Sequence, residues 1–223
     1  LKALSDRIGG FEGEIMLMTL APELKGSADV IKSLKSLGVV ACLGHSMADA
    51  STSFKAFEQG IGMLTHTFNA MPGLQHRSPG PVGAAIENGE ISLGLIADGV
   101  HVNPHIATFL QRLAPEHVVL VSDGLAPYGL DEGEYLWDKR VLFSNKGVCR
   151  LQDGTLVGSA LPLLEGCRRL ATWSGDASAA IWAATIAPRR VLNQSLSVQQ
   201  NLTGQPLKNL LRWNENPDGY GLI

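Results

Sequence analysis

The sequence predicts an α/β protein in which parallel strands alternate with helices. Short apolar runs rich in Val, Ile and Leu recur as far as residue 121. Segments with apolar residues at helical spacing lie between these runs, and the connections are short. Such alternation implies parallel strands joined by right-handed crossovers. The sequence therefore predicts either an open doubly wound sheet or part of a (β/α)8 barrel.

Five strands are expected, each at an apolar run bounded by turn residues. They cover residues 14–20, 39–43, 61–65, 91–96 and 118–121.

Helices are expected between these strands. The first begins at a Ser27 cap, and the second begins at a capping box formed by Ser46 and Asp49. A short helix begins near Pro81, and another begins at Pro104. The last has an i, i+3, i+4, i+7 apolar stripe on one side. The stripe consists of Ile106, Phe109, Leu110 and Leu113.

The pattern changes beyond residue 123. Residues 135–143 and 147–151 are predicted to form a hairpin, and Asp153-Gly154 marks another turn. Two helices are expected at 161–173 and 177–186, the second with an Asp176 cap and an end at Pro188.

Composition excludes several classes of protein. The net charge is −3 with both signs mixed along the chain, so no basic face for nucleic acid or for a membrane surface is expected. No apolar run approaches the roughly 18 residues that a spanning helix needs. Three widely spaced cysteines, Cys42, Cys149 and Cys167, indicate buried thiols rather than disulfides or a thiolate zinc site. The expected location is the cytoplasm.

Three of the predicted strands are followed by residues that can bind a metal ion or transfer a proton. The strand at 39–43 leads to His45, the strand at 61–65 leads to His66, and the strand at 118–121 leads to Asp123. If the strands are parallel neighbours, the two imidazoles emerge side by side, as a zinc-like ion requires. Asp123 would then act as general base and general acid. The alternatives are structural histidines and an Asx turn at Asp123.

A loop with glycines follows His66. The backbone of Asn69-Ala70, with Gly80 and Gly83, can present amide groups to an anion, and Arg77 can bind a phosphate with two hydrogen bonds. Asp98, before a glycine, is interpreted as a turn residue.

Taken together, seven segments resemble one family. They read Thr-Leu-Ala-Pro-Glu at 19–23, Gly-His-Ser at 44–46, Thr-His-Thr-Phe-Asn-Ala-Met-Pro at 65–72, Arg-Ser-Pro-Gly-Pro-Val-Gly at 77–83, Ala-Asp-Gly-Val-His at 97–101, Ser-Asp-Gly-Leu-Ala-Pro at 122–127 and Gly-Thr-Leu-Val-Gly-Ser-Ala at 154–160. The family is that of N-acetylglucosamine-6-phosphate deacetylase, in the amidohydrolase superfamily. The segments occur in the order that the family has.

The resemblance implies a (β/α)8 barrel with its site at the carboxyl ends of the strands. It implies a divalent metal ion, zinc or alternatively iron(II), with His45 and His66 as ligands and Asp123 as the catalytic acid/base. His101 resembles a substrate-binding residue near the sugar and the reacting carbonyl. The implied reaction releases acetate from N-acetylglucosamine 6-phosphate.

The resemblance also assigns the remaining substrate contacts. Asn69 and Ala70 would hold the phosphate through their backbone, and Arg77 would contact it, often from the neighbouring subunit of a homodimer. Ser159 would lie in a loop near the substrate.

One element of the family is missing from the sequence. The family's carboxylate ligand is the glutamate of a Glu-Gly-Pro segment at the end of the third strand, and no such segment occurs here. We therefore expect residues 1–192 to form barrel strands four to eight, without the first three. Residues 193–223 are expected to be a tail without a predicted structure.

Two alternatives remain open at this point. The first is another metal-dependent amidohydrolase of the dihydroorotase or deaminase kind, although the early His-x-His pair that is usual in those enzymes is not visible here. The second is a catalytically incomplete fragment that binds a sugar phosphate.

Overall fold

The computed structural model describes most of the chain, in two compact units. Residues 13–194 are described without a gap, as are residues 4, 6, 9–11, 197, 204–206, 211–216 and 219–222. The first unit comprises Leu1–Gly94 with Arg190–Gln194, and the second comprises Leu95–Arg189 with Ser195–Ile223.

A parallel sheet organises the first unit. Its strands are β1 (Leu17–Leu20), β2 (Val40–Leu43), β3 (Ile61–Leu64) and β4 (Ser92–Leu95), in that order. Each neighbouring pair is parallel. The predicted α/β class with parallel strands is therefore confirmed.

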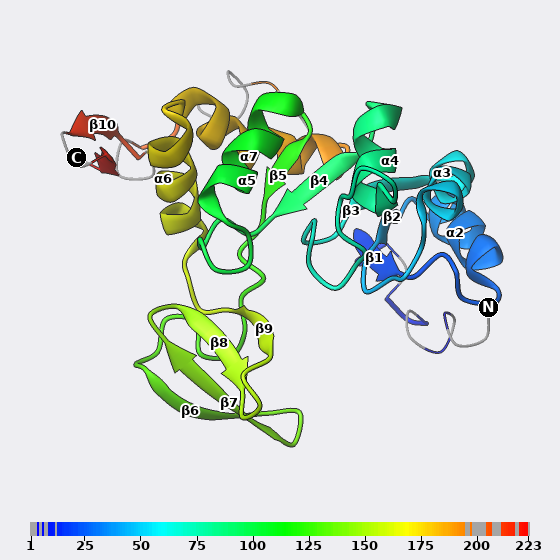
Figure 1. The fold of residues 1–223 in the computed structure, drawn as a ribbon, viewed down its shortest axis with the longest axis horizontal. Coiled ribbons are helices and arrows are strands. Elements are labelled where there is room, and N and C mark those ends of the chain that lie inside the picture. Colours follow the sequence, from blue (N-terminus) through cyan, green and yellow to red (C-terminus); the bar gives the residue numbers. More distant parts are fainter. Residues whose placement is uncertain are drawn as a thin grey trace. The chain divides into compact units, whose positions relative to one another are not determined.

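Three helices connect these strands, and they lie beside the strands of the first unit in Figure 1. They are α2 (Ser27–Ser36), α3 (Ala50–Gln59) and α4 (Gly80–Asn88). Buried apolar side chains on the helices and strands form the core of this unit, among them Ile31, Leu34, Leu43 and Leu64.

Both predicted serine caps are wrong. The N-cap of α2 is Gly26, while the Ser27 hydroxyl donates to the Pro22 carbonyl at 2.5 Å. The N-cap of α3 is Asp49, which accepts from the Thr52 amide. Ser46 is too far upstream to cap α3, because the loop after β2 continues to residue 49 before the helix starts.

The second unit continues the alternation. Helix α5 (Pro104–Leu113) precedes β5 (Val118–Leu120), and the Val121 amide after β5 donates to the Leu95 carbonyl at 3.0 Å. The predicted stripe on α5 is only partly buried, since Leu110 is buried but Ile106, Phe109 and Leu113 are exposed. The buried residues of α5 are instead Ala107, Leu110 and Gln111.

An antiparallel sheet follows β5. Its strands are β6 (Gly133–Trp137), β7 (Arg140–Asn145), β8 (Val148–Leu151) and β9 (Leu156–Ser159). The expected single strand at 135–143 is wrong, because a turn at Asp138 and Lys139 divides it. Both residues have positive φ, the geometry that a tight two-residue hairpin requires. The predicted turn before β8 is confirmed.

Two helices and a hairpin complete the chain. Helices α6 (Leu163–Ser174) and α7 (Ala177–Val191) match the prediction, except that α7 continues past Pro188. The Arg189 guanidinium donates to the Thr185 carbonyl at 2.8 Å, so this carbonyl in the helical turn before Pro188 has a side-chain donor. Much of the expected tail at 193–223 lies outside the described residues. Within it, β10 (Trp213–Asn216) pairs with β11 (Gly219–Leu222).

Among the described residues, no helix combines the length and apolar composition that would let it cross a membrane.

A bulge in β3 sets the register of the sheet. Ala41 pairs with Ile61, but Cys42 pairs with Met63 and Leu43 with Leu64, so β3 contains one extra residue at Gly62. Beyond this bulge every residue of β2 is matched by the residue 21 positions later. Bulges commonly redirect side chains next to a site.

Gly94 provides a test of the packing behind β3. A Cβ at this position would lie 2.9 Å from the Leu64 carbonyl oxygen and 3.1 Å from the His66 amide nitrogen. We expect Gly94→Ala to lower the free energy of unfolding by about 1–3 kcal/mol, measured by urea denaturation, because backbone must move to make room. Gly73→Ala is the control, since its Cβ meets nothing within 4 Å. Equal stability of the two variants would contradict this packing.

Candidate active site

The structure brings two of the predicted metal ligands together. His45 and His66 each lie two residues beyond the paired Leu43 and Leu64, so the parallel register delivers both to the same level. Their Nε2 atoms are 2.9 Å apart, and the rings are nearly perpendicular, at 82°. The predicted convergence of the two imidazoles at one edge of the sheet therefore holds in the first unit.

The second nitrogen of His66 is held by the backbone. Its Nδ1 lies 3.1 Å from the Asn69 carbonyl oxygen, and the side chain is almost fully buried. A carbonyl only accepts hydrogen bonds, so this contact favours the tautomer with the proton on Nδ1 and the lone pair on Nε2. Histidines that bind metals are commonly oriented in this way by a carbonyl or carboxylate.

The geometry of the pair fits two neighbouring positions around a divalent ion. Two metal–nitrogen bonds of about 2.0–2.1 Å separate their nitrogens by about 2.9 Å when they meet at about 90°, and by about 3.3 Å at the tetrahedral angle that zinc prefers, so the two rings stand within about 0.5 Å of either arrangement. Among the residues that the structure describes, no group of three or more His, Cys, Asp or Glu side chains is placed to hold an ion. The described residues therefore account for two ligands of such a site.

Several of the predicted site residues adopt a backbone conformation that is rare outside glycine. The φ angles are 49° at His45, 30° at His66, 48° at Ala70 and 48° at Asp123. Non-glycine residues with positive φ are uncommon and gather at functional sites, where surrounding contacts hold them. These angles support a functional interpretation of the strand ends, which the sequence pattern alone left open.

Glu23 anchors the loop that carries His45, a role that the sequence did not reveal. Its carboxylate accepts from the Ser46 hydroxyl and from the Met47 amide, each at 2.6 Å. Burial raises the pKa of Glu23, but these hydrogen bonds lower it by more than burial raises it. The pKa of Glu23 therefore lies below its ordinary value. The signal available in the sequence was a carboxylate just beyond the end of β1.

The loop after His66 is closed by its own hydrogen bonds. The Asn69 amide donates to the His66 carbonyl at 2.9 Å, and its side-chain amide donates to Thr67 at 3.2 Å. The Ala70 carbonyl accepts from the Ser46 amide at 3.0 Å, which ties the two histidine loops together. Since the Asn69 amide closes the turn, Ala70 is the better placed of the two predicted residues to offer an amide to an anion.

Arg77 lies at the tip of a tight loop. Gln75 and Ser78 exchange two backbone hydrogen bonds of 3.1 Å across it, and the Arg77 side chain is exposed. An exposed guanidinium on a rigid tip is suited to a ligand outside its own loop.

In the second unit, β9 holds the loop that carries Asp123. The Ser159 amide donates to the Asp123 carbonyl at 3.0 Å, and the Leu125 amide donates to the Ser159 carbonyl at 2.9 Å. A Cβ at Gly158 would lie 2.8 Å from the Asp123 carbonyl oxygen, so glycine permits this close approach.

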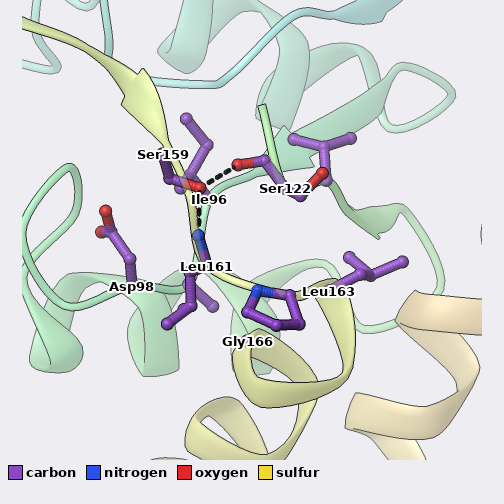
Figure 2. Close-up of a pocket in the computed structure, with 10 residues that line it drawn as sticks. Ile96, Asp98, Ser122, Ser159, Leu161, Leu163 and Gly166 are labelled. Carbon is purple, nitrogen blue, oxygen red and sulfur yellow. Dashed lines mark hydrogen bonds between the residues drawn. The ribbon is translucent and has the colours of Figure 1, made fainter. Parts of the chain in front are cut away.

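The Ser159 hydroxyl forms its hydrogen bonds with main-chain groups of the same unit. It donates to the Ser122 carbonyl at 2.6 Å and accepts from the Leu161 amide at 3.3 Å, and the residue is fully buried. Figure 2 shows both hydrogen bonds at the edge of a small pocket. The pocket is lined by Ile96, Ala97, Asp98, Val121, Ser122, Ser159, Leu161, Pro162, Leu163 and Gly166. Substrate contact by Ser159 stays a prediction.

Asp98 and His101 form a buried pair that sequence reasoning missed. Asp98 Oδ1 accepts from the amides of Val100 and His101, each at 2.8 Å, which confirms the predicted turn. Asp98 Oδ2 lies 2.6 Å from His101 Nδ1. Burial raises the pKa of Asp98, but hydrogen bonds from His101 and the two amides outweigh it, so the net pKa is lowered.

Removal of the Glu23 anchor should weaken metal binding. We expect Glu23→Ala to raise the dissociation constant for Zn²⁺ by about 10- to 100-fold, measured by competition with a chromophoric chelator, because the His45 loop loses two hydrogen bonds. Glu58→Ala is the control, since Glu58 is exposed on α3 of the same unit. An unchanged dissociation constant for Glu23→Ala would show that the loop holds His45 without this anchor.

A scan against protein-family models finds no match. The chain is nevertheless similar to curated proteins. It is 36% identical over 179 residues to an N-acetylgalactosamine-6-phosphate deacetylase of Escherichia coli O157:H7, covering 80% of this chain and 48% of that protein. It is 31% identical over 203 residues to an N-acetylglucosamine-6-phosphate deacetylase of Vibrio furnissii, covering 91% and 50%. The chain thus spans about half the length of the curated relatives it matches.

Solved structures give the same relationship. A mutant N-acetyl-D-glucosamine-6-phosphate deacetylase of Mycobacterium smegmatis, in complex with N-acetyl-D-glucosamine-6-phosphate, superposes with a TM-score of 0.81 at 30% identity, over 86% of this chain and 52% of that chain. The deacetylase of Thermotoga maritima gives a TM-score of 0.77 at 27% identity, over 82% and 50%. By sequence and by fold, this chain is therefore a relative of the N-acetylglucosamine-6-phosphate deacetylases of the amidohydrolase superfamily.

Proposed function

We propose that this chain carries the metal-binding and acid/base residues of a hydrolase that converts N-acetylglucosamine 6-phosphate to glucosamine 6-phosphate and acetate. The observation that carries the proposal is the approach of His45 and His66 to 2.9 Å at the ends of two parallel strands. On this proposal the parallel sheet is part of a (β/α)8 barrel, with residues 1–192 as its strands four to eight.

The metal ion is a divalent cation held by His45 and His66, with zinc favoured over iron(II) because imidazole nitrogens are good zinc ligands. When bound, it supplies Lewis-acid chemistry, polarising the amide carbonyl and lowering the pKa of water. Asp123 removes the proton from the attacking water and returns it to the departing glucosamine nitrogen. The left-handed backbone at Asp123, whose carbonyl accepts from the Ser159 amide of β9, supports this role because it holds the residue at a strand end.

The phosphate is bound by main-chain and side-chain groups together. The Ala70 amide offers a neutral donor, Asn69 holds the turn that presents it, and Arg77 supplies a charged donor. Because Arg77 is exposed at a loop tip, it is suited to reach a substrate held by the second subunit of a homodimer. His101 completes the substrate contacts, and Ser159 lies near the substrate with its hydroxyl bonded to the loop that precedes Asp123.

Two alternatives to this proposal are a different class of amidohydrolase and a different amino sugar substrate. The relatives described above are deacetylases, which disfavours an enzyme of the dihydroorotase or deaminase kind. The substrate sugar is less constrained, because the Escherichia coli relative is named for N-acetylgalactosamine 6-phosphate. The two sugars differ only at the C4 hydroxyl, so both belong in any assay.

Asp123 gives the direct test of the reaction. We expect Asp123→Asn to lower the rate of acetate release by about 10²- to 10⁴-fold, because an amide cannot take up the proton. The assay uses Zn²⁺-loaded protein with both 6-phosphates and with unphosphorylated N-acetylglucosamine. Asp131→Asn is the control, since Asp131 is exposed near β6.

Two results would refute the proposal. The first is undiminished turnover by Asp123→Asn. The second is equal activity on the phosphorylated and unphosphorylated sugars. Absence of acetate release by the wild-type protein, with retained binding of the sugar phosphate, would favour the incomplete binding fragment.

A further inference from the structure

The buried pair of Asp98 and His101 lies at the carboxyl end of β4. Their side chains are only 2% and 5% exposed, and the Oδ2–Nδ1 distance is 2.6 Å. The two residues are three positions apart across Gly99, so the contact closes within one turn.

Other groups of the second unit fix this turn. The Arg169 guanidinium of α6 donates to the Asp98 carbonyl at 2.6 Å, and it also donates to Glu165 at 2.9 Å. A Cβ on Gly99 would lie 3.3 Å from the Trp173 ring, so the indole packs closely against the turn. The Asp98 carboxylate accepts two main-chain hydrogen bonds besides the one from the ring. The imidazole therefore faces a carboxylate that has little freedom to move.

We propose that Asp98 is a positioning residue that fixes the tautomer of His101 with the proton on Nδ1, leaving Nε2 as the nitrogen that accepts a hydrogen bond from the substrate. An ionised carboxylate can only accept, so Nδ1 must donate. The neutral ring then carries its lone pair on Nε2, on the side away from Asp98. The partner of Nε2 is a polar hydrogen of the substrate, the amide N–H or a sugar hydroxyl. The substrate part of this inference depends on the proposed function.

Substitution by asparagine should invert the tautomer. In Asp98→Asn, the side-chain oxygen can keep both main-chain hydrogen bonds only if the NH2 group takes the place of Oδ2. That group donates, so Nδ1 must offer its lone pair, and the ring proton moves to Nε2. A donor then faces the donor of the substrate.

The first test reads the tautomer directly. Protein labelled with ¹⁵N-histidine is examined by two-bond ¹H–¹⁵N correlation, at a pH well above the ordinary histidine pKa of about 6.5. His101→Gln identifies the signals of His101. We expect the Nδ1–H form in the wild type and the Nε2–H form in Asp98→Asn. Asp153→Asn is the matched control, because Asp153 caps a similar turn at 2.9 Å from the Thr155 amide and is exposed.

The second test reads the consequence for the substrate. We expect Asp98→Asn to raise KM by about 10- to 100-fold with a smaller change in kcat, since one acceptor becomes a donor. An Nε2–H form in the wild type, or the same tautomer in the wild type and in Asp98→Asn, would overturn the proposal. An inverted tautomer with unchanged KM would overturn its substrate part. Because the spectrum needs no turnover, failure of the proposed reaction is distinguished from failure of the Asp98 role.

Discussion

The parallel pairing of β2 with β3 is the constraint on which the candidate metal site depends. Leu43 pairs with Leu64, so the residues two positions further on, His45 and His66, stand at the same level. A slip of one residue would place Thr65 opposite His45, and the side chains would alternate to the other face. The extra residue at Gly62 prevents this, because it shifts the register by one between Ala41 and Cys42. The bulge is thus part of the site although it lies several residues before either histidine.

Hydrogen bonds from side chains to the backbone hold the other loops of the candidate site in place. Polar side chains hold a loop at a strand end in three places, at Glu23, Asp98 and Ser159. Each of these loops also carries a residue with a predicted chemical role. Asp98 and Ser159 are buried, and because a buried polar group is costly unless it is paired, their contacts fix one loop conformation rather than several. The positive φ angles at His45 and Asp123 are tolerated for the same reason.

The sequence predicted the strand–helix alternation and the residues at the strand ends, because apolar runs and turn residues act locally. It did not predict contacts that depend on register or on distant segments. The isolated Gly62 is compatible with a bulge but does not define the register that results, and the Glu23 contact joins residues 23 positions apart. The apolar stripe on α5 did not predict which residues are buried. Spacing shows which side chains share a face of the helix, but it does not show which other element packs against that face. The pair of Asp98 and His101 was accessible in principle, since their i, i+3 spacing spans a single turn.

Whether His45 and His66 hold one metal ion can be measured from the coordination of the bound ion. X-ray absorption at the zinc edge, on protein loaded with one equivalent of Zn²⁺, reports the imidazoles in the ligand shell. We expect two imidazole nitrogens at about 2.0–2.1 Å, and one after either His45→Gln or His66→Gln. A spectrum without imidazole scattering, or one that neither substitution changes, would contradict this expectation.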